Sequence, residues 1–384
     1  MPNYAPTLRV LRTTRAHWVP GFSDMTIEDH PILAAMKSKG QIDYDCTGTQ
    51  YEETLKYKRN TLSGYTDMQR LNWARHNNKL KMYLPVRGLK MTDIVSDLEM
   101  RMNSGKEAIA REFAKKLNDM GQDASDDFGK HLYYDGSATA YSTFLHGIQS
   151  FCSHSAGTST DAFATTLDDT YGTLSTARAA YGGTVRGGGS PSGDNFESDD
   201  PEFDFFSPIM VNVTYDDGTT THSWSQDAVK IIARAINHAT RGKAKRHKLD
   251  LFTMSRADFL TFKDQLRGKE RINVDPGPDR SLLVKLGFGN VVNIDGVDCI
   301  ADPDMPSTTG GTTSVTTRAY GWNFDFLKLC LWGRPGASQK NVDGLWNASG
   351  DAWDEDEQIY KYWVGLWGNF VMYPRHFCEV AEYA

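Results

Sequence analysis

Between residues 45 and 91 the hydrophobic and polar positions alternate with the period of β-strands. Residues 51–58 alternate in this way, and a second run places Leu80, Met82 and Leu84 on one face. Neither run has enough apolar residues to bury a whole face, and an isolated two-stranded ribbon is only marginally stable in water. The pattern predicts a long ribbon that lies against another part of the protein or against another chain.

The next pattern is helical and long. From Thr92 or Asp93 onward, apolar residues recur mostly every four positions, and Gly121 is the predicted stop. The apolar positions are Ile94, Leu98, Met102, Ile109, Phe113, Leu117 and Met120. A helix of about 28 residues is roughly 42 Å long. No partner helix of that length is predicted elsewhere, so we expect this helix to pack across a sheet.

Two segments show little regular pattern. Residues 1–44 mix prolines with isolated apolar positions, which favours an extended arm in which only residues 32–39, before Gly40, predict a short helix. Residues 136–208 are rich in Ser, Thr, Gly and Asp, and their glycine-rich part predicts a long surface loop.

Residues 209–301 alternate between strand and helix patterns. Strands are predicted at 209–215 and 249–254, and helices follow at 225–241 and 256–267. The spacing of Ser255 and Asp258 matches a capping box, and Asp295-Gly296 between two apolar runs predicts a hairpin. These signals predict an α/β domain with its own core.

The C-terminal part holds most of the tryptophans. Two apolar strands are predicted at 322–332 and 358–373, joined by a Gly- and Asp-rich loop at 333–357. Tryptophan is enriched in interface hot spots as well as in cores. We expect this element to pack against the long helix or against a neighbouring subunit.

Composition narrows the function classes. The chain has 384 residues, 42 Lys and Arg, 49 Asp and Glu, and a net charge of −7. This balance excludes a strongly basic nucleic-acid-binding protein and a highly charged disordered chain. The longest apolar run, at 32–36, is too short to span a membrane, and no apolar signal region follows the N-terminal arginines. We expect an intracellular product without a membrane partner.

Local signatures of chemistry are absent from the sequence. No GxSxG, HExxH or phosphate-binding glycine motif is present. The five cysteines are scattered without CxxC spacing, which predicts free thiols: Cys46, Cys152, Cys299, Cys330 and Cys378. We therefore predict no catalytic residues, no metal ligands and no cofactor.

Several stretches, together with the order of elements, carry a resemblance. They are Asp135-Gly136 to His146-Gly147-Ile148, residues 170–175, residues 251–255 with Phe259 and Phe262, residues 295–306 followed by 323–329, and residues 365–370 with Pro374-Arg375. With the arm, ribbon, long helix and α/β domain, they make the chain resemble the major capsid proteins of tailed bacteriophages with the Hong Kong 97 fold.

The resemblance implies an α+β fold whose segments have named roles. These are an N-terminal arm at 1–44, a two-stranded E-loop at 45–91, a spine helix and peripheral domain at 92–135, an axial α/β domain at 136–317, and return strands and a loop of the peripheral domain at 318–384. It also implies a non-enzymatic virion protein, assembled in the host cytoplasm. That protein forms hexamers and pentamers of an icosahedral shell around double-stranded DNA.

The expected partners are other copies of the chain, a portal and a decoration protein. Because the arm and E-loop use all the residues before the spine helix, we also expect a separate scaffolding protein. The expected intersubunit residues are Arg9, Arg12, Arg15, Lys56, Lys58, Arg59, Tyr65, Trp346 and Trp353. The three arginines of the arm are expected to contact a neighbour or the genome.

Two other functions stay open at the level of sequence. An encapsulin-like compartment shares the fold but encloses enzymes rather than a genome. An enzyme would have its site in the axial domain around His146, Cys152 and Asp302.

Overall fold

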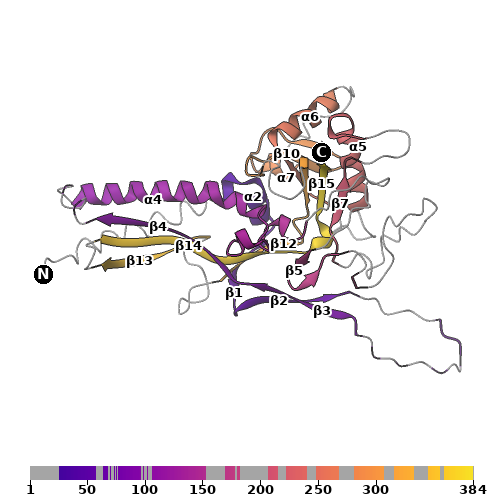
Figure 1. The fold of residues 1–384 in the computed structure, drawn as a ribbon, viewed down its shortest axis with the longest axis horizontal. Helices are drawn as coiled ribbons and strands as arrows, with labels where there is room; N and C mark the ends of the chain where they lie inside the picture. The colour runs from indigo at the N-terminus through magenta and orange to yellow at the C-terminus, as the bar shows by residue number, and fades with distance from the viewer. Residues whose placement is uncertain are drawn as a thin grey trace.

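Two β-sheets and one long helix make up most of the structure (Figure 1). The computed structural model describes residues 26–57, 64–67, 70, 73, 75, 77–96, 98, 102, 106–152, 169–177, 180–181, 206–214, 222–239, 248–267, 281–306, 315–332, 345–354 and 359–383. Of these, residues 45, 106–113, 238, 315, 347–354 and 383 are described by their backbone alone. The predicted glycine-rich loop at 182–193 lies outside the described residues.

The first sheet has five strands and is organised around β14 (Ile359–Met372). β4 (Arg87–Ser96) pairs antiparallel with β14 from Ile359 to Gly368. β13 (Asn347–Asp354) and β12 (Leu327–Trp332) also pair antiparallel with β14. β4 occupies one edge of β14. β13 and β12 pair with successive parts of the opposite edge of β14. β1 (Ile42–Cys46) completes the sheet by pairing parallel with β12.

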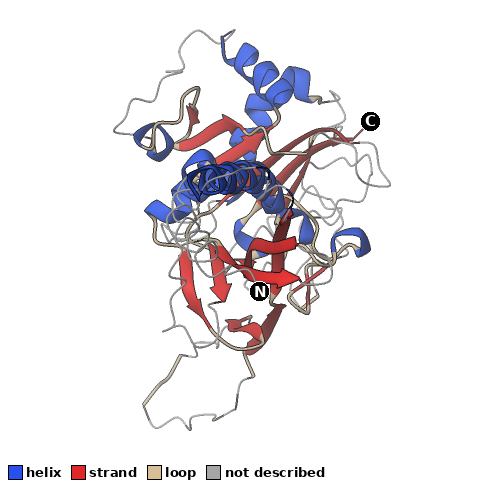
Figure 2. Cartoon of the chain, turned by 90° about the vertical axis from the view of Figure 1, so that its left-hand side faces the viewer, coloured by secondary structure: helices blue, strands red, loops and turns tan. Residues whose placement is uncertain are grey.

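The long helix α4 (Lys106–Phe128) covers one face of this sheet, as predicted (Figures 1 and 2). Among the described residues of the helix, the buried apolar side chains are Leu117, Met120, Ala124 and Phe128. The ring of Phe128 lies 5.9 Å from the ring of Phe370 on β14 and 5.5 Å from that of Trp346. The C-terminal half of α4 is therefore held by apolar packing on the sheet.

Both predicted bounds of this helix are wrong. Residues 92–96 belong to β4, because their backbone groups pair with β14 over the whole length of the strand. Gly121 does not stop the helix, which continues to Phe128 because Ala124 and Phe128 extend its buried face. The four-residue spacing that includes Ile94 was compatible with either structure, and pairing with a distant strand decided it.

The predicted ribbon is confirmed as β2 (Gln50–Lys56) paired antiparallel with β3 (Lys79–Pro85). Its base lies against this same chain: the Tyr83 amide donates to the Gly172 carbonyl at 3.0 Å. Gly172 joins the short strands β5 (Thr170–Tyr171) and β6 (Leu174–Ser175). The backbone there has a positive φ of 56°, and a Cβ would come within 2.3 Å of the Met82 side chain, so this contact requires glycine.

The second sheet has six strands. Their order is β7 (Ile209–Asn212), β15 (Cys378–Tyr383), β11 (Val315–Trp322), β8 (Leu251–Met254), β10 (Val297–Ala301) and β9 (Val292–Ile294). Helices α5 (Trp224–Ala239) and α6 (Arg256–Arg267) pack on this sheet in a core of their own. The predicted hairpin is confirmed, with positive φ at Asp295 and Gly296, and the Asp258 amide donates to the Ser255 hydroxyl as the predicted cap requires.

The C-terminal residues 318–384 contribute to both sheets rather than to one. β11 and β15 lie in the six-stranded sheet, whereas β12, β13 and β14 lie in the five-stranded sheet. The strand predicted at 322–332 is two strands, because the Asn323 side chain accepts the Asp325 amide at 3.0 Å and turns the chain between them. The predicted loop at 333–357 contains β13.

Short helices complete the structure. The helix predicted at 32–39 is confirmed as α2 (Pro31–Ser38), and Gly40 follows it with a φ of +67°. α7 (Leu282–Lys285) is capped by Ser281, and 3-10 turns lie at 129–132, 139–141, 148–150 and 374–376. In the part of the chain that the structure describes, no helix is long and apolar enough to cross a membrane.

We predict that Phe128→Ala lowers the free energy of unfolding by about 3–5 kcal/mol, because it removes a buried ring between α4 and β14. Leu260→Ala on α6 is the matched control: this side chain is exposed, and a change within about 0.5 kcal/mol is expected. Urea unfolding of the unassembled chain measures both. Equal losses in the two variants would contradict the packing of α4 on the sheet.

Candidate assembly surfaces

Large apolar side chains are exposed where β4 leads toward α4. Ile94, Leu98 and Met102 are 50%, 67% and 76% exposed. The sequence pattern placed all three on the buried face of the long helix. Instead their side chains are exposed in this chain, Ile94 on β4 and the other two between β4 and α4. We call these three residues the β4–α4 patch.

An exposed tryptophan lies on the central strand of the same sheet. Trp367 on β14 is 55% exposed although it pairs with Gly88 on β4. A Cβ at Gly88 would lie 2.8 Å from the Trp367 ring, so the indole lies flat against the glycine and leaves its other face open. Exposed apolar groups of this size are typical of interaction surfaces when they gather.

The turn beyond the ribbon carries two further exposed aromatic residues. Tyr65 is 60% exposed and Trp73 is 85% exposed, and both lie between β2 and β3. Lys56, at the end of β2, is also exposed. Lys58 and Arg59, and the arm residues Arg9, Arg12 and Arg15, lie outside the described residues.

The two C-terminal tryptophans expected between subunits have different positions. Trp346 is buried in this chain, where its indole N–H donates to the Thr26 hydroxyl at 3.2 Å and its ring packs on Phe128. It is a packing residue of the five-stranded sheet and helix layer. Trp353 lies on β13, opposite Tyr360 on β14, and only its backbone is described.

The residues of the enzyme alternative have structural partners. Burial lowers the pKa of His146 to about 3, and burial raises the pKa of the Cys152 thiol, which is the opposite of an activated nucleophile. Asp302 accepts a hydrogen bond from the Tyr133 hydroxyl at 2.6 Å. His146 Nδ1 lies 3.2 Å from the buried Ser150 hydroxyl, and since His146, Cys152 and Asp302 are all buried, these contacts hold the fold together.

A buried ion pair joins three separate parts of the chain. His30, just before α2, approaches Asp304 with its Nδ1 at 2.7 Å and the Ser125 carbonyl of α4 with its Nε2 at 2.8 Å. Both ring nitrogens face acceptors, an arrangement that only the doubly protonated ring satisfies. Burial lowers the pKa of His30, but the hydrogen bonds to Asp304 and to Ser125 outweigh it and raise the pKa overall.

Comparison with known proteins gives one line of evidence. No protein-family model and no curated protein matches the chain. Among solved structures, a chain of the cyanophage A-1(L) capsid matches with a TM-score of 0.54 and 15% identity, over 91% of this chain and 92% of that one. The fold is the Hong Kong 97 fold. This confirms the α+β fold expected from the resemblance, and at this identity the likeness shows the fold alone.

Looser likenesses were found to other particles. The capsid of a native GTA particle matches with a TM-score of 0.47 and 10% identity, over 91% of this chain and 90% of that one. The mature capsid of bacteriophage PhiM1 matches with a TM-score of 0.45 and 10% identity, over 90% and 86% of the two chains.

We predict that the pH dependence of stability changes in His30→Gln. The raised pKa means that the folded chain binds more protons than the unfolded chain, so the free energy of unfolding falls as pH rises. The contribution of His30 is complete below about pH 6.5, the ordinary value for histidine, and is lost as pH rises through the raised pKa.

Urea unfolding of the unsubstituted protein and of His30→Gln, from below about pH 6.5 to above the raised pKa of His30, measures this difference in pH dependence. The unsubstituted protein should lose more stability with rising pH than His30→Gln does. Parallel pH profiles for the two proteins would show that His30 is not charged in the fold.

Proposed function

We propose that this chain is a major capsid protein that self-assembles into hexamers and pentamers of an icosahedral shell around double-stranded DNA. The observation that carries the proposal is the shared fold, which extends over nine-tenths of this chain and of the cyanophage A-1(L) capsid chain.

The exposed surfaces support the same function on physical grounds. The β4–α4 patch, Trp367 and the aromatic residues beyond the ribbon leave large apolar side chains in water. Covering one such side chain completely stabilises an assembly by about 1.5–3 kcal/mol. In a closed shell every subunit makes each contact with its neighbours, so small gains per residue are repeated around the particle.

The segments take the following roles in this proposal. The arm at 1–44, with Arg9, Arg12 and Arg15, contacts a neighbour or the genome. The E-loop at 45–91 reaches over an adjacent subunit through Lys56, Lys58, Arg59 and Tyr65, and Trp353 contributes on the peripheral side. The spine helix and peripheral domain at 92–135 and the return segment at 318–384 form the peripheral side, and β11 and β15 of the return segment enter the sheet of the axial domain at 136–317. A separate scaffolding protein, a portal and a decoration protein are the further partners, and the shell forms in the host cytoplasm before it becomes the virion.

The proposal is tested by the size and content of native particles. Expression of the full chain, alone and with a scaffolding protein encoded beside it, should give closed shells by size-exclusion chromatography and negative-stain microscopy. Native particles should contain double-stranded DNA. A stable monomer or dimer under all of these conditions would overturn the proposal, and particles filled with an enzyme rather than DNA would identify a compartment.

We predict that exposed aromatic and apolar residues control assembly without controlling the fold. Trp73→Ser in the E-loop and Leu98→Ser in the β4–α4 patch should each raise the concentration needed for assembly at least tenfold, since about 1.4 kcal/mol corresponds to a factor of ten.

Leu260→Ser on α6 is the control at an exposed apolar position away from these surfaces. Light scattering measures assembly, and circular dichroism checks that each variant is folded. Folded Trp73 and Leu98 variants that assemble like the control would remove these residues from the interface.

A further inference from the structure

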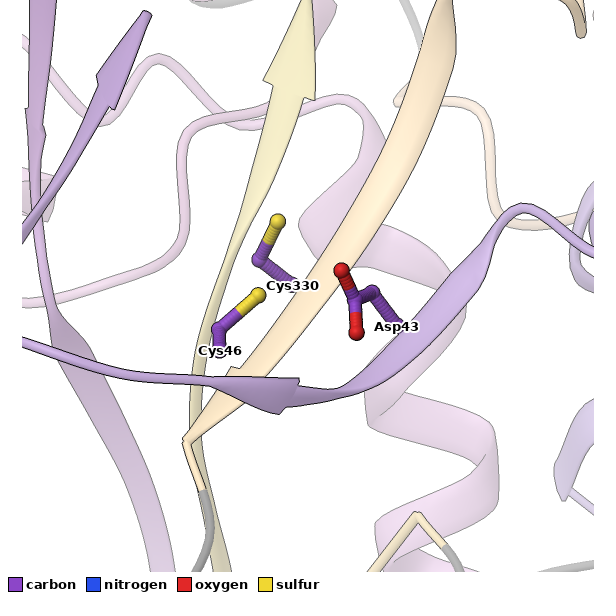
Figure 3. Close-up of side chains that lie close together, drawn as sticks. All are labelled: Asp43, Cys46 and Cys330. Atoms are coloured by element: carbon purple, nitrogen blue, oxygen red, sulfur yellow. The ribbon is translucent and has the colours of Figure 1, made fainter. Parts of the chain in front are cut away.

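Two strands from distant parts of the sequence bring three side chains with metal-binding atoms together. Asp43 and Cys46 lie on β1, and Cys330 lies on β12. Their thiol and carboxylate atoms all lie within 4.8 Å of one another. Figure 3 shows the three side chains converging between the two strands. In the part of the chain that the structure describes, this is the group in which three His, Cys, Asp or Glu side chains bring their ligand atoms this close together.

The convergence depends on an irregularity in β1. Residues three positions apart in a regular strand point to opposite faces, so Asp43 and Cys46 would be separated. The ladder shifts between them: Asp43 pairs with Cys330, and Cys46 pairs with Trp332, two positions further along β12. Three residues of β1 therefore span two residues of β12. This bulge turns Asp43 and Cys46 to the same face as Cys330.

The donor set has the composition of a zinc site. Thiolates and carboxylates are established zinc ligands, and around a tetrahedral ion their donor atoms lie about 3.5 Å apart, which small side-chain adjustments reach from the observed spacing. Cys330 is fully buried and Cys46 is half-buried, so the group opens to solvent on one side. That side supplies an entry path and a water molecule for the fourth position.

A lysine next to the group completes the charge balance. Lys328 lies two positions before Cys330 on β12, and its Nζ is 2.8 Å from Asp43 Oδ2. Such an outer contact orients a carboxylate beside a metal site. Two thiolates, one carboxylate, one lysine and a divalent ion sum to zero charge, which is favourable because the buried Cys330 thiolate is not left with an unpaired charge.

We propose that Asp43, Cys46 and Cys330 bind a zinc ion, with Lys328 as the second-shell residue that positions Asp43. A disulfide between the two cysteines is the competing arrangement of the same atoms. Both cysteines are free thiols in the structure, and Asp43 adds a carboxylate within reach of them that a disulfide would not use. Zinc would fasten β1 to β12 at the point where the chain leaves the sheet for the ribbon.

The test uses the full chain purified with a reducing agent and stripped of metal. Zinc is added, excess is removed, and bound zinc is measured by mass spectrometry. One zinc per chain is expected, and cobalt in its place should show the thiolate-to-cobalt charge-transfer band. Cys46→Ser and Asp43→Asn should lose zinc and shift or abolish the band. Cys299→Ser on β10, a buried cysteine outside the group, should keep both.

Lys328→Met distinguishes a positioned carboxylate from a simple cluster of thiols. It should weaken zinc binding roughly 10–100-fold while leaving the chain folded by circular dichroism. The test uses Cys46→Ser rather than a substitution of the fully buried Cys330, because Cys46 is half-buried and its substitution is less disruptive to folding. The proposal is overturned if the reduced chain binds no zinc or cobalt, if folded Cys46→Ser binds as well as the unsubstituted chain, or if peptide mapping finds Cys46 and Cys330 joined under the reducing conditions.

Discussion

The structure depends on the backbone hydrogen bonding of β14 along both of its edges. Fourteen residues of extended chain present two rows of amide and carbonyl groups, and buried groups of this kind must be paired. β4 pairs with one row from Ile359 to Gly368, and β13 and β12 divide the other between them. The position of the ribbon follows from this, because β1 pairs with β12 and β4 continues from β3. The position of α4 follows as well, since Phe128 packs on Phe370 of the same strand.

Features that depend on neighbours in the sequence could be predicted from it. The Asp295-Gly296 hairpin, the Ser255 cap, the ribbon and the short helix before Gly40 each need only a few adjacent residues, and each is present. The start of α4 could not be predicted in the same way. Ile94 fits a helical spacing and a strand equally well, and its backbone is extended because β14, far along the chain, supplies its partners. β13 was missed for the same reason, since a Gly- and Asp-rich segment becomes a strand only where an edge is open to it.

The candidate surfaces were visible in the sequence mainly as residue types. Tyr65 was expected at an interface and is exposed, whereas Trp346 was expected there and is buried on Phe128. Tryptophan enrichment alone cannot separate these cases, because cores and interfaces favour the same side chain. The β4–α4 patch is the opposite case. The spacing of its apolar residues in the sequence indicated a buried helix face, but the side chains are exposed. The group of Asp43, Cys46 and Cys330 had no signal, since a bulge in one strand and pairing with a distant one create it.

The order in which the sheets receive their strands has a consequence for synthesis on the ribosome. β14 is the centre of one sheet, and β15 lies between β7 and β11 in the other, yet each is translated after all the other strands of its own sheet. A nascent chain that has not reached them has neither sheet complete, and pairing between such distant segments is slow to form. Prematurely terminated polypeptides would therefore lack a stable fold and be left to cellular proteases.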